Sequence, residues 1–265
     1  MPMRIALAQI VTGRDTAANL EKVERYAADA ADAGASLVVF PEATMRAFGN
    51  SLVDIAEPIE GPWAARIREI AASHSITVVA GMFTPGGEGR VVNTLLVAGR
   101  EANTEYDKIH LYDAFGFKES DTVEPGTGPV TFELDNVTFG LTTCYDVRFP
   151  GLYVANADAG AQVNIVCASW GAGPGKNEQW DLLVRARALD STTYVLAAGQ
   201  GDPSTLGIDN PKNAPLGIGH SAVISPLGEV LQQAGGNEEL LVADIDPDVV
   251  RQTRDKLPVL ANRRL

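Results

Sequence analysis

The chain has 265 residues, of which 45% are hydrophobic and 21% are charged, and we interpret residues 1–265 as a single domain with a substantial core. Its 34 acidic and 21 basic residues give a formal net charge of −13, which argues against nucleic acid or an anionic membrane as a general partner. No apolar stretch approaches the roughly 20 residues of a membrane-spanning helix, and the opening apolar run does not resemble a secretion signal, so we expect a cytoplasmic protein.

Strands and helices alternate in the first part of the chain. Apolar residues at helical spacing predict one helix over Thr16–Ala33 and another that begins at Pro62. Short apolar runs predict strands at Arg4–Ile10, Leu37–Phe40 and Thr77–Phe83. This β-α-β-α-β order predicts an α/β protein.

The middle of the chain changes to hairpins, which predicts a mixed sheet, and alternation then resumes. The expected hairpin strands are Val91–Val97, Thr131–Leu134 and Val137–Thr142. After them we expect a helix over about Gly151–Ala159, a strand at Val163–Ala168, a helix around Glu178–Asp190, a strand at Thr193–Ala198, and a hairpin of Ser221–Ser225 with Val230–Gln233. The segment between Gly199 and Gly219 is dense in Gly, Pro, Asp and Asn and predicts an ordered loop or a lid over a site.

Three strand-like runs end on residues that suit acyl transfer from a carbon–nitrogen bond, namely Glu42, Lys108 and Cys144. A thiol with an ordinary pKa near ~8.5 is mostly protonated at neutral pH, so its attack needs a base and a cation nearby. We assign Glu42 as the base that takes the thiol proton, passes it to the leaving nitrogen and later activates water. Lys108 and the backbone N–H of Tyr145 are the candidates to hold the oxyanion.

These residues lie in segments that resemble the motifs of the nitrilase superfamily of carbon–nitrogen hydrolases. The matching segments are Phe40-Pro41-Glu42, Asp107–Asp113 and Thr143–Pro150, in the family's order. Further likeness at Arg185–Ala188, Gly219-His220-Ser221 and Arg263-Arg264 extends the resemblance over nearly the whole chain. The resemblance implies an α-β-β-α sandwich of two mixed sheets flanked by helices, no cofactor, and a homodimer or higher homo-oligomer. It also implies that Glu119 positions the lysine and the substrate amide.

Within the superfamily, the segment Cys144–Pro150 is similar to the small amidases that include omega-amidase and the deaminated-glutathione amidase. Arg148 can pair with a substrate carboxylate through a bidentate fork, which would favour amides of dicarboxylic acids. Tyr145 and Trp170 are the other candidate substrate-binding residues. Two features depart from related branches: Gly151 stands where a glutamate often follows, and Trp170–Trp180 lacks a Gly-Pro-Ala-His sequence. Both bear on the choice of substrate.

We therefore expect a thiol amidohydrolase that acts on a small linear amide through an acyl-enzyme on Cys144 and releases ammonia and a carboxylic acid. Hydrolysis of a nitrile or an N-carbamoyl group on the same residues is the alternative within enzymes. A non-catalytic binding protein with this fold is the alternative from another class.

Each candidate residue also has a structural interpretation. Cys144 alone suits a buried hydrophobe, Lys108 and Glu119 suit solvated charges, and Arg148 can bridge to Asp146 or to a loop. Glu42 alone suits a cap or an ion pair at the end of a strand.

The sequence also bears on histidine roles, metal binding and nucleotide binding. We expect His110 and His220 to be hydrogen-bonded structural imidazoles rather than partners of the cysteine. The spacing of Cys and His does not indicate a metal site, and Gly171–Gly175 lacks the features of a phosphate-binding loop, so no cofactor is expected. A disulfide between Cys144 and Cys167 is disfavoured.

Overall fold

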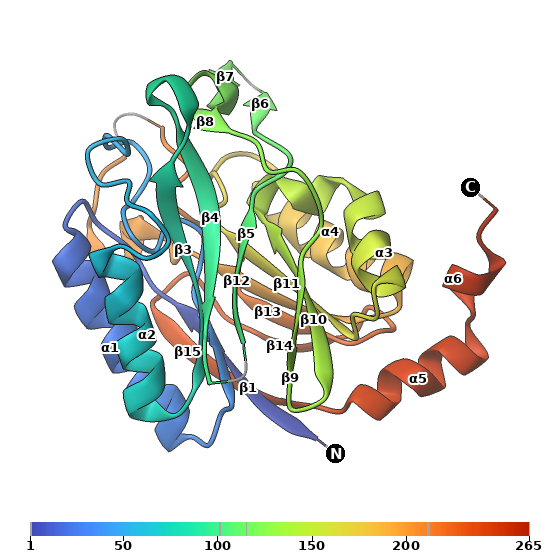
Figure 1. Cartoon of the computed structure of the whole chain (residues 1–265). Coiled ribbons are helices and arrows are strands. Elements are labelled where there is room, and N and C mark those ends of the chain that lie inside the picture. Colours follow the sequence, from blue (N-terminus) through green and yellow to red (C-terminus); the bar gives the residue numbers. More distant parts are fainter. Residues whose placement is uncertain (1, 101, 115, 211–212, 265) are drawn as a thin grey trace.

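The computed structural model describes residues 2–100, 102–114, 116–210 and 213–264. Two mixed β-sheets stack face to face, and helices cover their outer faces (Figure 1). This arrangement is the α-β-β-α sandwich that the resemblance implied. Among the described residues, no helix has both the length and the apolarity that crossing a bilayer requires.

The first sheet combines three parallel strands with antiparallel neighbours on both sides. Strands β1, β2 and β3 are parallel, β15 runs antiparallel to β1, and β4 and β5 continue from β3 as antiparallel neighbours. The strands are, in sheet order, β15 (Glu239–Ile245), β1 (Met3–Gln9), β2 (Leu37–Val39), β3 (Thr77–Pro85), β4 (Val91–Ala98) and β5 (Asn103–Asp107), while β8 (Val123–Glu124) also pairs with β4.

The second sheet is arranged similarly, with parallel strands in the middle and hairpins at its edges. Strands β10, β11 and β12 are parallel, and the predicted hairpins β9–β10 and β13–β14 are confirmed. In sheet order the strands are β14 (Val230–Gln233), β13 (Ala222–Ile224), β12 (Tyr194–Gly199), β11 (Val163–Ala168), β10 (Val137–Thr143) and β9 (Thr131–Leu134). A separate small hairpin joins β6 (Asp113–Ala114) to β7 (Phe117–Lys118).

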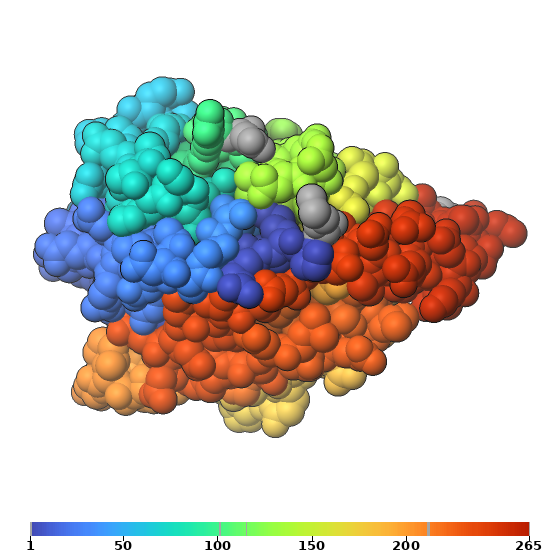
Figure 2. All heavy atoms as spheres, turned by 90° about the horizontal axis from the view of Figure 1, so that it is seen from below, coloured from blue at the N-terminus to red at the C-terminus, as the bar shows by residue number. Residues whose placement is uncertain are grey.

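Helices close the sandwich on both sides. Helices α1 (Thr16–Asp32) and α2 (Pro62–His74) cover the first sheet, and α3 (Pro150–Asp158) and α4 (Lys176–Ser191) cover the second (Figure 1). The C-terminal helices α5 (Pro247–Lys256) and α6 (Val259–Asn262) project from one end of the molecule (Figure 2). Short 3₁₀ turns lie at Gly87–Gly89 (η1), Glu119–Asp121 (η2), Cys144–Arg148 (η3) and Pro203–Leu206 (η4).

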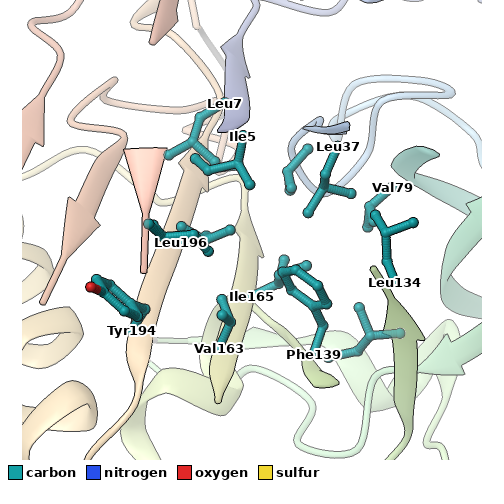
Figure 3. Packing of buried hydrophobic residues seen from close by; sticks show 14 of the residues in the cluster. Ile5, Leu7, Leu37, Val79, Leu134, Phe139, Val163, Ile165, Tyr194 and Leu196 are labelled. Atoms are coloured by element: carbon teal, nitrogen blue, oxygen red, sulfur yellow. The ribbon is translucent and has the colours of Figure 1, made fainter. Parts of the chain in front are cut away.

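The main core lies between the two sheets. Figure 3 shows Ile5 and Leu7 of β1 facing Ile165 and Leu196 of the opposite sheet, and all four side chains are fully buried. Ala6, which lies between them in β1, points the other way and belongs to the cluster under α1 and α2. Because both faces of the central strands are buried, these strands read as continuous apolar runs rather than as alternating ones.

Candidate active site

Strand ends from both sheets meet at one edge of the sandwich. Glu42 follows β2 and Lys108 follows β5 in the first sheet, while Cys144 follows β10 and Ser169 follows β11 in the second. Because β5 runs parallel to β3 through two antiparallel steps, its carboxyl end lies at the same edge as that of β2. The fold therefore brings together three side chains that are far apart in the sequence.

A cavity of about 310 Å³ opens at this edge, within the size range of small-molecule sites. Its charged lining residues among those described are Glu42, Lys108, Glu119 and Lys176. Aromatic rings supply much of the remaining wall, and the lining includes Phe48, Tyr112, Phe117, Tyr145 and Trp170 beside Cys144. The loop after β12 contributes Asn213 and Pro215, and residues 211–212 of that loop lie outside the described residues.

Cys144 occupies a backbone conformation that few residues with a side chain adopt. Its φ is +47°, at the start of the η3 turn that directly follows β10. Such left-handed positions cost free energy and cluster at functional sites. The turn leaves Cys144 half-buried at the cavity, with its Sγ atom 3.9 Å from the carbonyl oxygen of Ser169.

Burial and the neighbouring charges favour the protonated form of the Cys144 thiol. Burial, followed by the negative charge of Glu42, raises its pKa well above the ordinary value, and the positive charge of Lys108 only partly opposes this. Both Cys144 and Cys167 are free thiols.

Lys108 lies between two carboxylates in the buried part of the site. Its Nζ atom donates to Glu42 Oε1 at 3.0 Å and to the two carboxylate oxygens of Glu119 at 3.0 and 2.9 Å. Burial lowers the pKa of Lys108, but Glu119 and Glu42 outweigh that effect and hold it well above the ordinary value. The lysine is therefore a permanent cation at neutral pH. Glu119 also accepts the backbone N–H of Tyr112 at 2.6 Å.

Glu42 is fixed by two partners that the sequence did not indicate. Asn93 Nδ2 donates to Oε1 at 2.8 Å, and the backbone N–H of Ser169 donates to Oε2 at 2.8 Å. A polar Asn93 inside the apolar run of β4 was the one available signal. The backbone around Glu42 is packed equally closely, because a side chain on Gly81 would come within 2.7 Å of the nitrogen of Ala43.

The buried carboxylate of Asp146 connects the lysine loop, which follows Lys108, to the cysteine turn, which is the η3 turn that begins at Cys144. It accepts hydrogen bonds from Tyr106 Oη at 2.6 Å and from the backbone N–H groups of His110 and Thr143 at 3.0 and 2.8 Å. The ring nitrogen Nδ1 of His110 lies 2.7 Å from the same carboxylate, and the ring stacks on Phe149 with centroids 3.7 Å apart. His110 is thus a hydrogen-bonded structural imidazole, as expected.

His220 is also held in a structural role. Its Nε2 atom lies 3.2 Å from Asn177 Nδ2, and its backbone carbonyl accepts the indole N–H of Trp180 at 2.9 Å. These contacts place His220 beside α4 rather than in the Glu42–Lys108–Cys144 cluster.

The three expected substrate-binding residues differ in position. Tyr145 and Trp170 line the cavity, whereas Arg148 is not among the described lining residues. Its guanidinium instead donates to Gln179 Oε1 at 2.7 Å and lies over the Trp170 ring at 5.1 Å. Arg148 therefore contacts Gln179 of α4 rather than Asp146. The described cation at this part of the wall is Lys176, which the sequence did not single out as a binding residue.

No described cluster of three His, Cys, Asp or Glu side chains has an arrangement that could hold a metal ion. The polar groups of the cavity have protein partners instead: Lys108 with its two carboxylates, and Glu42 with Asn93 and Ser169. The arrangement can supply a base, a fixed cation and a thiol to one bound molecule.

A sandwich of two sheets with a Glu, Lys and Cys cluster at its strand ends defines a carbon–nitrogen hydrolase of the nitrilase superfamily. The chain belongs to this family: the family model for carbon–nitrogen hydrolases matches residues 4–255. The predicted recognition and fold class are confirmed.

Similar proteins include amidases. The chain is 58% identical to a hydrolase of Mycobacterium tuberculosis, over 98% of this chain and 95% of that protein. It is 36% identical to a deaminated glutathione amidase of Escherichia coli, over 99% and 97%. A solved structure of a Nesterenkonia amidase variant, with the acetamide moiety of fluoroacetamide covalently added at its active-site cysteine, superposes with a TM-score of 0.82 at 27% identity and covers 99% of this chain and 94% of that one.

Proposed function

We propose that this protein is an amidase that hydrolyses a small linear amide through a thioester on Cys144. The observation that carries the proposal is the Lys108 ammonium, held at 3.0 Å from Glu42 and at 2.9 Å from Glu119 beside a neutral thiol at the cavity. This arrangement supplies a nucleophile, a base and a fixed positive charge to one bound carbonyl group.

In the acylation step, the Cys144 sulfur attacks the amide carbon while Glu42 accepts the thiol proton. A C–S bond forms, and the carbonyl π electrons move onto oxygen, where the charge of Lys108 and the N–H of Tyr145 stabilise the oxyanion. As the tetrahedral intermediate collapses, the C–N bond breaks and the protonated Glu42 gives its proton to the nitrogen. Ammonia leaves, and the acyl group remains on sulfur.

Deacylation uses the same carboxylate again. Glu42 removes a proton from water, the resulting hydroxide attacks the thioester carbon, and the C–S bond breaks. The sulfur recovers its proton from Glu42, and the acyl group departs as a carboxylic acid. The raised pKa of Cys144 suits this cycle because the thiol is neutral whenever the site is empty.

The relatives agree with this chemistry. The covalent adduct at the active-site cysteine of the Nesterenkonia amidase supports a nucleophilic role for Cys144. The similarity to a deaminated glutathione amidase supports an amide over a nitrile or an N-carbamoyl group. Hydrolysis of a nitrile or of an N-carbamoyl compound by the same residues is the alternative to be tested.

The test is turnover of matched substrates. The protein is incubated with an amide, a nitrile and an N-carbamoyl compound of equal chain length, while ammonia release and the intact mass are recorded. We expect ammonia from the amide and an acyl adduct that is absent from Cys144→Ala. Absence of both turnover and adduct with every substrate would favour the non-catalytic binding protein.

A further inference from the structure

A second cation, Lys176, faces the cavity apart from the Glu42–Lys108–Glu119 cluster. It is the first residue of α4 and lines the cavity. Its ammonium lies over two aromatic walls, 5.7 Å from the ring centroid of Trp170 and 5.8 Å from that of Tyr112. Cation–π contacts of this kind hold a flexible lysine head group within a restricted region. The ammonium of Lys176 is therefore positioned to contact a molecule bound in the cavity.

The surroundings of Lys176 favour an anion. Burial, followed by the positive charge of Arg148, lowers its pKa. Arg148 lies over the same Trp170 ring, so two positive charges share one partly desolvated region. A bound anion would offset both the desolvation and the mutual repulsion.

The inner part of the cavity has the opposite preference. Two carboxylates, Glu42 and Glu119, flank a single ammonium there, and all three side chains are at most 5% exposed. An anionic end of a substrate is repelled from this inner cluster and attracted to Lys176. The charge distribution thus sets the direction in which an asymmetric molecule enters the cavity.

We propose that Lys176 is the specificity-determining residue that binds an anionic group, such as a carboxylate, at the far end of the substrate's acyl chain. The proposal rests on the proposed amidase function. The sequence suggested that Arg148 binds the substrate carboxylate, and we assign that contact to Lys176. Arg148 instead lies over the Trp170 ring and donates to Gln179. Lys176 binds and orients the substrate and takes no part in bond breaking.

A charge series of substrates tests the proposal. Three primary amides of similar length are compared: glutaramate with a terminal carboxylate, pentanamide with a neutral end, and 5-aminopentanamide with a cationic end. We expect the unmodified protein to prefer glutaramate in kcat/KM. Lys176→Met should lower kcat/KM for glutaramate about 10- to 100-fold, the value of a charge-assisted hydrogen bond, and change that for pentanamide less than about threefold. Lys176→Glu should reverse the order in favour of 5-aminopentanamide.

Two further variants control for charge and for the neighbouring cation. Lys256→Met removes the same charge from the exposed end of α5 and should leave all three rates unchanged. Arg148→Met should affect glutaramate less than Lys176→Met does. Loss of the preference for glutaramate in Arg148→Met with none in Lys176→Met would overturn the proposal, as would equal losses on glutaramate and pentanamide in Lys176→Met.

Calorimetric titration with glutarate separates this inference from the proposed function. We expect the unmodified protein to bind glutarate at least tenfold more tightly than Lys176→Met does. If that holds while no amide is hydrolysed, the anion site stands and the amidase function fails. If pentanamide is hydrolysed but glutarate binds both proteins equally, the amidase function stands and the role of Lys176 is wrong.

Discussion

Lys108 carries a positive charge in a part of the protein from which water is largely excluded, and two carboxylates make that charge stable. An ammonium buried alone would lose its proton, whereas one between Glu42 and Glu119 keeps it. The three groups are consequently interdependent. Removing the central cation leaves two buried carboxylates that repel each other, which is far more costly than losing an exposed ion pair.

We expect Lys108→Met to lower kcat about 10²- to 10³-fold with a much smaller change in KM, because the cation acts on charge that develops in the transition state. The same variant should lose roughly 3–5 kcal/mol of stability in urea unfolding because its carboxylate partners stay buried. Lys256→Met is the matched control, with neither effect. A rise in KM at constant kcat would contradict the catalytic role of Lys108.

The Cys144 thiol should make stability depend on pH. Its pKa is raised in the folded state, so above an ordinary pKa of about 8.5 the unfolded chain has released this proton while the folded protein retains it. The contribution of Cys144 is therefore complete below that pH and declines as pH rises. We expect the free energy of unfolding to fall more steeply between pH 8.5 and 10 than in Cys144→Ala, by up to about 1.4 kcal/mol per pH unit. Parallel curves for the two proteins would contradict the raised pKa.

At the scale of elements, the site depends on a join between β5 and β10, which belong to different sheets. The Asp146 carboxylate makes this join by accepting from Tyr106 in β5 and from Thr143 at the end of β10. The turn that carries Cys144 is thereby held against the loop that carries Lys108. A carboxylate this deeply buried needs all of its donors.

Tyr106→Phe should therefore lower stability by about 1–3 kcal/mol, because Asp146 loses one hydrogen bond without gaining water. It should also lower kcat, since the cysteine turn is no longer pinned to the lysine loop. Tyr153→Phe is the control, because the Tyr153 hydroxyl is equally buried but contacts Thr142 instead. Equal losses of kcat in the two variants would show that the join to Asp146 is unimportant.

Local patterns were sufficient for most elements and for the three clustered side chains. The apolar run Val163–Ala168 and the hairpin arm Val230–Gln233 were predicted with the bounds of β11 and β14, because turn residues flank both. Strand β15 and helix α5 were not assigned; β15 is defined by its pairing with β1, which is distant in the sequence. Asn93 and Lys176 were missed for the same reason, since their roles arise from contacts across strands and loops.

At the scale of the whole molecule, α4 and the neighbouring β13–β14 turn expose three leucine side chains. Leu182 and Leu189 of α4 are 68% and 43% exposed, and Leu227 of the adjacent β13–β14 turn is 52% exposed. The turn packs on the helix, because Arg185 Nε donates to the carbonyl oxygen of Gly228 at 2.8 Å. Exposed apolar side chains on adjacent elements are typical of protein contacts. We propose that this surface joins two copies of the chain, in line with the expected homodimer.

Replacing Leu182 and Leu189 together by Asp should convert a dimer to a monomer in light scattering after size-exclusion chromatography, because each buried charge opposes the contact. Val53→Asp is the control at a comparably exposed apolar residue outside α4. A dimer that persists in the double variant would place the interface elsewhere.

Strand β1 lies between β2, which follows it closely in the sequence, and β15, which is synthesised much later. While the ribosome is still adding residues, one side of β1 offers unsatisfied N–H and C=O groups to any other extended chain. Nascent chains should thus stay vulnerable to misassociation until β15 pairs with β1, and a stop codon at position 239 should yield insoluble protein even though the cysteine, glutamates and lysine of the site are all retained.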